Sequence, residues 1–219
     1  MLRCFSVITE SMIFSAVLKP RVSEIAYHAI ADMQITEREV KSWQSDVDLF
    51  VNDDFESGET HRQAAAELIR QLSVCYPNGI QGCVAAVMLR LREATERRKR
   101  GNPFWWKLRE AALYALEAII DKVAKVQGLL DIESMFASLC GVDCRCSTSS
   151  QLSAGEQFLL CRALSLAAAA GRVVRREVSL PLFQHAALTL ASGTPMTIPK
   201  IGACKMIKTY RDHLSHIHT

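Results

Sequence analysis

Residues 102–125, NPFWWKLREAALYALEAIIDKVAK, predict the helix around which the rest of the chain is arranged. Asn102 is a favourable N-cap, and Pro103 suits the first helical position, where its missing N–H costs nothing. Apolar residues then recur at steps of three and four, as one face of a helix requires. They are Trp105, Leu108, Ala112, Ala115, Leu116, Ile119, Val123 and Val126. At a rise of about 1.5 Å per residue, a helix over 103–127 is roughly 35 Å long.

The opposite side of this helix is expected to be polar. Its stripe consists of Lys107, Glu110, Tyr114, Glu117, Asp121 and Lys125. Trp105 and Trp106 point roughly 100° apart, so they can contact two different neighbouring helices. Burying an indole removes about 150–250 Å² from water, so at least one of the two is expected in the core rather than stacked on a ligand.

The composition limits the class of protein. Of the 219 residues, 49% are apolar, which is ample for a core, and no alternating β-strand pattern is present. The net charge of +3 is too small to indicate a nucleic-acid-binding protein. Eight cysteines without a signal peptide indicate a reducing compartment and free thiols. The apolar start at 2–17 is too short and polar to span a membrane, and is expected to form a buried helix.

The same periodicity predicts helices along the whole chain, which is therefore all-α. They are expected at 2–17, 21–34, 37–43, 60–76, 80–99, 103–127, 131–140, 154–170, 179–191 and 199–214. Capping boxes at Thr36–Glu39 and Ser153–Glu156 mark two of the starts. Ser179 is expected to cap the helix that carries Pro181 in its first turn. An acidic loop at 44–60 and a polar loop at 141–152 separate helices.

The helices recur in pairs, which indicates a repeat protein. First helices begin near residues 60, 103, 154 and 199, at steps of about 43, 51 and 45, against the roughly 40–47 residues of HEAT or armadillo units. The predicted fold of 1–219 is a HEAT-repeat, ARM-like α-solenoid of about four helical hairpins plus an unpaired last helix. Polar capping repeats are lacking, so a segment of a longer superhelix is expected.

Four stretches carry a resemblance to a known family. They are MQITEREVKSW (33–43), AAAELI (64–69), NPFWWKLREAALYAL (102–116) and FLLCRALSLAAA (158–169). In this order, and over about residues 20–214, the chain resembles the middle of a karyopherin-β (importin-β) nuclear transport receptor. The stretches are repeat-specific sequence, not catalytic motifs.

The resemblance implies a HEAT superhelix that imports basic cargo, such as histones and ribosomal proteins, and releases it on binding Ran-GTP. It also implies contacts with nucleoporins and shuttling between the cytoplasm and the nucleus through the nuclear envelope. Two alternatives remain open: a HEAT scaffold that assembles other proteins without Ran, and an inactive fragment. No catalytic motif is present, so an enzyme is not expected.

The acidic loop is the candidate cargo-binding site, and the family has an acidic loop at this place. It contains six carboxylates and no lysine or arginine: Asp46, Asp48, Asp53, Asp54, Glu56 and Glu59. A lysine-rich partner would gain charge-assisted contacts there. The alternative is a solvated linker without a partner, because charge runs are usually solvated.

Two other clusters favour structural roles. The run Arg97–Arg98–Lys99–Arg100 resembles a nuclear localisation or phosphate-binding motif, but positive charge at a helix C-terminus is also explained by the helix dipole. The spacing of Cys140, Cys144 and Cys146, with Cys161 nearby, fits none of the common zinc patterns. Free thiols are therefore expected, and neither a metal nor another cofactor is predicted.

Overall fold

The computed structural model describes residues 16–55, 60–144, 152–171, 174–193 and 197–215. All regular elements in these ranges are helical, and no strand occurs among them, which confirms the all-α prediction. The helix expected at 2–17 falls almost entirely outside the described ranges. The chain divides into two compact units, Met1–Val123 (unit 1) and Ala124–Thr219 (unit 2).

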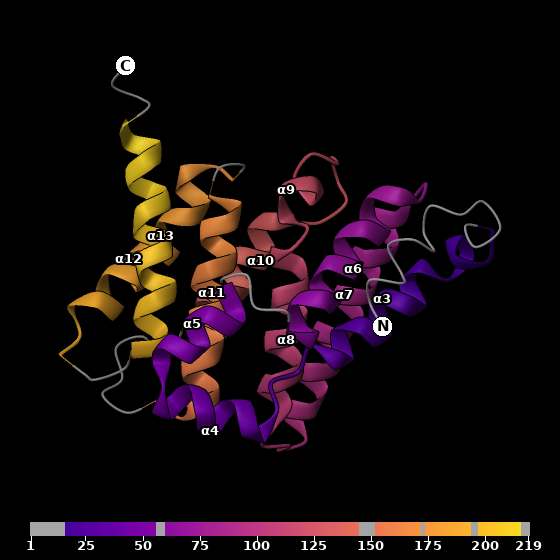
Figure 1. Ribbon diagram of the computed structural model, residues 1–219. Helices are drawn as coiled ribbons and strands as arrows, with labels where there is room; N and C mark the ends of the chain where they lie inside the picture. Colours follow the sequence, from indigo (N-terminus) through magenta and orange to yellow (C-terminus); the bar gives the residue numbers. More distant parts are fainter. Residues whose placement is uncertain (1–15, 56–59, 145–151, 172–173, 194–196, 216–219) are drawn as a thin grey trace. The chain divides into compact units, whose positions relative to one another are not determined.

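Unit 1 is built from a stack of long helices, labelled in Figure 1. Its elements are η1 (Lys19–Arg21), α3 (Val22–Asp32), α4 (Glu37–Ser45), α5 (Val47–Phe55), α6 (His61–Cys75), α7 (Gly79–Lys99), α8 (Trp105–Glu117) and α9 (Ile120–Val123). Helices α6 and α7 form a hairpin, α3 packs against both, and α8 packs against α7. The core between them is apolar, and Ile30, Ile69, Val87 and Leu113 are fully buried in it.

The predicted capping boxes are present. Thr36 accepts a hydrogen bond from the Glu39 N–H, and the Glu39 carboxylate accepts one from the Thr36 N–H at 2.7 Å. Ser153 and Glu156 make the same pair of bonds at the start of α11. A third capping box starts α6, where Thr60 pairs with glutamine Gln63 instead of glutamate.

The long helix expected over 103–127 is interrupted, so this prediction is wrong in its second half. Its start is also wrong by two residues, because α8 begins at Trp105 with Phe104, and not Asn102, at the N-cap. Helix α8 ends at Glu117, and the Ile119 N–H bonds to the Leu116 carbonyl in a tighter turn. Ile119 and Ile120 are both buried, at 0% and 2% exposure. On one continuous helix, consecutive side chains point about 100° apart. The turn allows both isoleucines to enter the core.

Unit 2 consists of α10 (Ile132–Ser138), the π-helical turn η2 (Leu139–Asp143), α11 (Ala154–Ala170), α12 (Arg176–Ala191) and α13 (Thr197–Ser215). The last helix, expected without a hairpin partner, packs against both α11 and α12 (Figure 1). The polar loop predicted at 141–152 is wrong at residues 141–143, because these belong to η2, and residues 145–151 lie outside the described ranges.

Helix α12 begins earlier than predicted. It starts at Arg176, so Ser179 is a buried residue of the helix and not its cap. Pro181 consequently lies inside the helix, beyond its first turn. The Ser179 hydroxyl pairs with the Tyr210 hydroxyl of α13, so the side chain that was expected to cap this helix contacts another helix instead. None of the described helices of the chain is long and apolar enough to cross a membrane.

Candidate functional site

The acidic segment predicted as a loop at 44–60 is largely helical. Helix α5 spans Val47–Phe55, so the loop prediction is wrong for these residues. Asp46 stabilises the start of the helix, because its Oδ1 accepts a hydrogen bond from the Leu49 N–H at 3.1 Å. Phe50 is 2% exposed and anchors the apolar side of the helix in unit 1. Apolar burial thus makes a helix of a segment whose charges suggested a loop.

The carboxylates of this segment have different environments. Asp46 and Asp48 are exposed at the start of α5. Asp53 is half-buried, and its Oδ2 accepts a hydrogen bond from Trp43 Nε1 at 2.9 Å. Two members of the predicted set lie outside the described residues: Glu56 and Glu59. The described carboxylates therefore do not form one uniform acidic surface.

Asp54 faces the core of unit 1 and belongs to a buried ion cluster. The guanidinium of Arg62, which is 1% exposed, donates two hydrogen bonds to the Glu110 carboxylate at 2.8 and 3.1 Å. Its Nη2 also lies 3.3 Å from Asp54 Oδ1, and its Nη1 donates to the Met33 carbonyl oxygen. The cluster joins α5, α6 and α8 to the end of α3. Asp54 is therefore structural and not accessible to a partner.

Two aromatic rings flank the same guanidinium. The Arg62 Cζ lies 5.1 Å from the ring centre of Tyr114 and 5.7 Å from that of Trp43. The predicted polar stripe of the 102–125 helix is consequently wrong at two positions, since Glu110 and Tyr114 are only 2% and 7% exposed. Sequence reasoning missed this cluster. The available signal was the phase of Arg62, which lies on the same face of α6 as the buried Ile69.

A hollow of about 420 Å³ opens between α4, α5 and the first residue of α6. It is lined by Thr36, Arg38, Glu39, Ser42, Trp43, Leu49, Asp53 and His61. Two carboxylates, one guanidinium, two hydroxyls and an indole thus surround one space. Of the predicted site residues that the structure describes, only Asp53 contributes to it.

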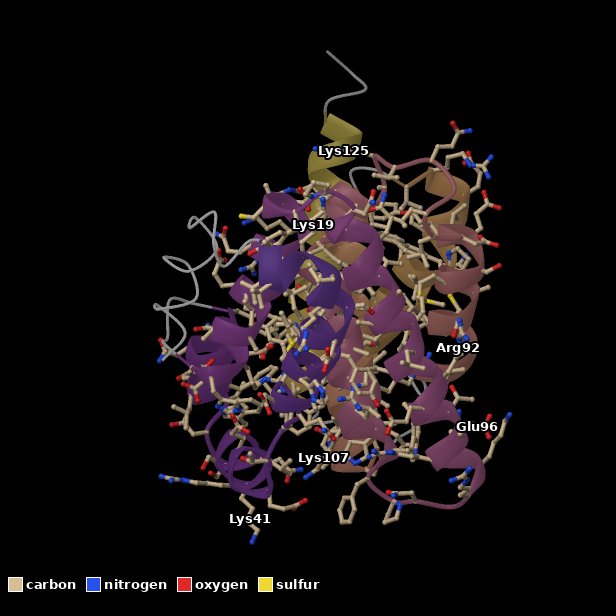
Figure 2. All side chains as sticks on the ribbon, turned by 90° about the vertical axis from the view of Figure 1, so that its right-hand side faces the viewer. Lys19, Lys41, Arg92, Glu96, Lys107 and Lys125 are labelled. Atoms are coloured by element: carbon tan, nitrogen blue, oxygen red, sulfur yellow. The ribbon has the colours of Figure 1, made fainter. Side chains whose placement is uncertain are left out.

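Lysines also lie near this part of unit 1. Lys107, at the start of α8, pairs through Nζ with Glu37 Oε1 at 2.5 Å. This hydrogen bond and the charge of Lys107 lower the pKa of the Glu37 carboxyl below its usual value. Lys41 extends from α4 at the same end of the view in Figure 2. Cations therefore offset part of the acidic potential on α4, while the start of α5 keeps its negative charges.

The basic run 97–100 ends α7, and its contacts favour the structural interpretation. Arg97 pairs with Glu93 one turn earlier at 2.6 Å. The Arg98 Cζ lies 4.7 Å from the ring centre of Trp105, which is half-buried. Burial alone would raise the pKa of Glu93, but hydrogen bonds from two arginines hold it below its usual value. The run thus stabilises the end of α7 and its contact with the start of α8.

The cysteines form no metal site within the described ranges. Cys140 is half-buried in η2, and Cys144, directly after η2, and Cys161 are buried, while Cys146 lies outside the described residues. No group of three or more His, Cys, Asp or Glu side chains suited to a metal occurs among the described residues. Burial raises the pKa of the Cys144 thiol well above its usual value, which keeps the thiol protonated.

Alkylation of the native chain is expected to separate exposed from buried thiols. Cys75 and Cys204 are exposed and should react with iodoacetamide near neutral pH. Cys83 should remain unmodified, because burial raises its pKa to about 12. Peptide-level mass spectrometry before and after unfolding in guanidinium measures this difference. Modification of native Cys83 as fast as Cys75 would contradict the packing of α6 on α7.

The sequence matches a known family over nearly its whole length. The family described as importin-9 central HEAT repeats matches residues 17–219. The chain belongs to this family. The importin-9 of Drosophila melanogaster is 25% identical over 118 residues, which are 52% of this chain. The chain spans only 12% of the length of that curated relative.

Membership of the importin-9 HEAT-repeat family confirms several predictions. The resemblance to the karyopherin-β family and the HEAT-repeat fold class are both correct. The family consists of transport receptors, so the prediction that the chain is not an enzyme is also confirmed. Cargo, Ran dependence and the role of the acidic segment stay predictions.

Proposed function

We propose that this chain is a HEAT-repeat segment, over residues 1–219, of a nuclear import receptor for basic proteins such as histones or ribosomal proteins. The observation that carries this proposal is the family match over residues 17–219. The proposal includes release of cargo by Ran-GTP, contacts with nucleoporins and shuttling between the cytoplasm and the nucleus through the nuclear envelope. A direct role in binding nucleic acid is not part of it.

The accessible carboxylates of the acidic segment are proposed to contact the cargo. Asp46, Asp48 and Asp53 remain candidates, because they are exposed or half-buried. Asp54 is withdrawn, since it is 4% exposed and paired with Arg62. Glu56 and Glu59 remain proposed members. Exposed ion pairs contribute only about 0.2–1 kcal/mol each, so several must act together.

Neutralising Asp46, Asp48 and Asp53 together as asparagines is expected to weaken binding of a core-histone dimer. Three lost ion pairs correspond to about 1–2 kcal/mol, or roughly 5- to 30-fold in affinity. The dependence of affinity on salt should become flatter, because screened charge contacts are removed. Titrations in low and in near-physiological salt measure both effects.

The matched control removes the same charge elsewhere in unit 1. Glu24→Gln, Asp32→Asn and Asp121→Asn change three exposed carboxylates outside the acidic segment. This control should keep most of the affinity for the histone dimer. Equal affinity and salt slope for the wild type and the α5 variant would reduce the segment to a solvated surface. A pull-down with Ran-GTP then separates a receptor, which binds it, from a scaffold that works without Ran.

A further inference from the structure

The hollow between α4 and α5 has fixed carboxylates in its wall. Asp53 Oδ2 is held by Trp43 Nε1 at 2.9 Å. Glu39 Oε2 is held by the backbone N–H and the hydroxyl of Thr36, both at 2.7 Å. Each carboxylate therefore has one oxygen engaged and a second oxygen in a defined position. Such preorganised acceptors do not lose side-chain freedom when a ligand binds.

The second oxygens remain available as acceptors. Asp53 Oδ1 accepts no hydrogen bond from the described part of the chain. Glu39 Oε1 has the imidazole of His61 at 4.0 Å, which is beyond hydrogen-bonding distance. A carboxylate has about four lone-pair sites for donors, so both groups can accept further bonds. The hollow thus presents two acceptors to one space of about 420 Å³.

We propose that this hollow binds a single cationic side chain, lysine or arginine, of a basic protein partner. The inference rests on the proposed function and names one specific contact for it. The ammonium or guanidinium would lie between Glu39 and Asp53. Its aliphatic stem would lie against Leu49, which is 37% exposed.

The charge of the wall agrees with such a ligand. Glu39 and Asp53 carry two negative charges, and Arg38 carries one positive charge at the exposed edge. Among the described lining residues one negative charge is left over, and a lysine or arginine side chain would neutralise it. Arg38 should therefore oppose the ligand, so Arg38→Gln is expected to tighten binding. An anionic ligand would show the opposite sign.

Both wall charges can be removed while their structural hydrogen bonds are kept. In Asp53→Asn the new amide oxygen can still accept from Trp43. In Glu39→Gln the capping box remains possible, because Thr60 and Gln63 form this same box at the start of α6. The double variant E39Q/D53N thus tests charge in the hollow with little change to α4 and α5.

The control variant carries the same loss of charge outside the hollow. Asp46 and Asp48 are exposed on the same segment and do not line the hollow. Asparagine at Asp46 keeps an oxygen for the Leu49 N–H. D46N/D48N therefore matches E39Q/D53N in charge, and circular dichroism should show equal helicity for both.

The experiment measures binding of fluorescein-labelled oligolysine and oligoarginine to the full chain by anisotropy in near-physiological salt. E39Q/D53N should lose about tenfold or more in affinity, since hydrogen bonds to charged groups are worth about 1.5–3 kcal/mol. D46N/D48N should lose less than E39Q/D53N, because exposed ion pairs contribute only about 0.2–1 kcal/mol each. Comparison of the two peptides shows which cation the hollow prefers.

A neutral variant tests occupancy of the hollow itself. Ser42 is half-buried in its wall, so Ser42→Phe should fill the space and weaken binding without changing any charge. Loss with both E39Q/D53N and Ser42→Phe supports the inference. If E39Q/D53N and D46N/D48N lose affinity equally and Ser42→Phe binds as the wild type does, the hollow is not the binding site. The proposed function, in which the acidic surface binds the cargo, is then still supported. Unchanged binding in every variant overturns both.

Discussion

Replacing Arg62 by methionine is expected to lower the free energy of unfolding of unit 1 by about 3–5 kcal/mol. Arg62 is 1% exposed and pairs with two carboxylates, on Asp54 and Glu110, that are also buried. Without the guanidinium these carboxylates remain in the core without their arginine partner. The methionine restores apolar volume but no charge, so the loss exceeds that of an ordinary core substitution.

Tryptophan fluorescence during urea unfolding measures this effect specifically. The three tryptophans of the chain, Trp43, Trp105 and Trp106, all lie in unit 1. Their signal therefore follows unit 1 and not unit 2. The control is Arg70→Met on the same helix, because Arg70 pairs with Glu67 at the surface with 42% of its side chain exposed. That variant should change stability by less than about 0.5–1 kcal/mol.

A second substitution tests the cause of the loss. Adding Glu110→Gln to Arg62→Met removes one of the two buried carboxylate charges that have lost the Arg62 guanidinium, so stability should recover by about 1–2 kcal/mol. In the presence of Arg62, the same change should destabilise instead, because it breaks the paired carboxylate. Equal effects of Glu110→Gln in both backgrounds would contradict coupling between the two residues.

Short-range signals in the sequence were sufficient to place most helices. A capping box needs only residues three apart, so the pattern around Thr36 and Ser153 located α4 and α11. The periodicity of α6 and α7 likewise follows from their own apolar faces. The repeat spacing then indicated the HEAT class, because helical hairpins of this length must stack to bury those faces.

The errors arose where tertiary contacts override local patterns. The segment of α5 carries many acids, yet Phe50 and Asp54 fix it on the core of unit 1. The charge of Glu110 predicts a solvent-exposed position on the polar side of the helix, but α8 is buried on nearly every side from Leu108 to Leu116. A charged residue there needs a partner from another helix. Its identity, Arg62, depends on packing that the sequence alone does not reveal.

The candidate site, too, could be predicted only in part from the sequence. Composition located the acidic segment, because a run without lysine or arginine is visible directly. It did not show which carboxylates face a partner, since that depends on the rotation of α5. The hollow combines Glu39 of α4 with Asp53 of α5 and His61 of α6, and only the fold brings these three together.

Gly202→Ala is expected to destabilise unit 2 by about 1–3 kcal/mol. Gly202 lies within α13 where this helix packs against α11. A Cβ at this position would lie 2.5 Å from the carbonyl oxygen and 3.0 Å from the Cα of Cys161. These are backbone atoms of α11, so relief requires the two helices to move apart.

The sign of this effect is the informative part. On an isolated helix, alanine is more favourable than glycine by about 1 kcal/mol, so local propensity predicts stabilisation. The close approach of α13 to α11 predicts the reverse. Hydrogen exchange by mass spectrometry should show faster exchange in peptides from α11 and α13, with α6 and α7 unchanged.

Gly193→Ala serves as the control, because a Cβ there meets no atom within 4 Å. It should leave exchange in α11 and α13 as in the wild type. Slower exchange in Gly202→Ala would mean that helix propensity outweighs the contact, and that α13 does not pack closely on α11. Helix α11 itself has small buried residues at Ala163, Ala167 and Ala170. If α13 does not pack closely on α11, close helix packing cannot be the reason for these alanines.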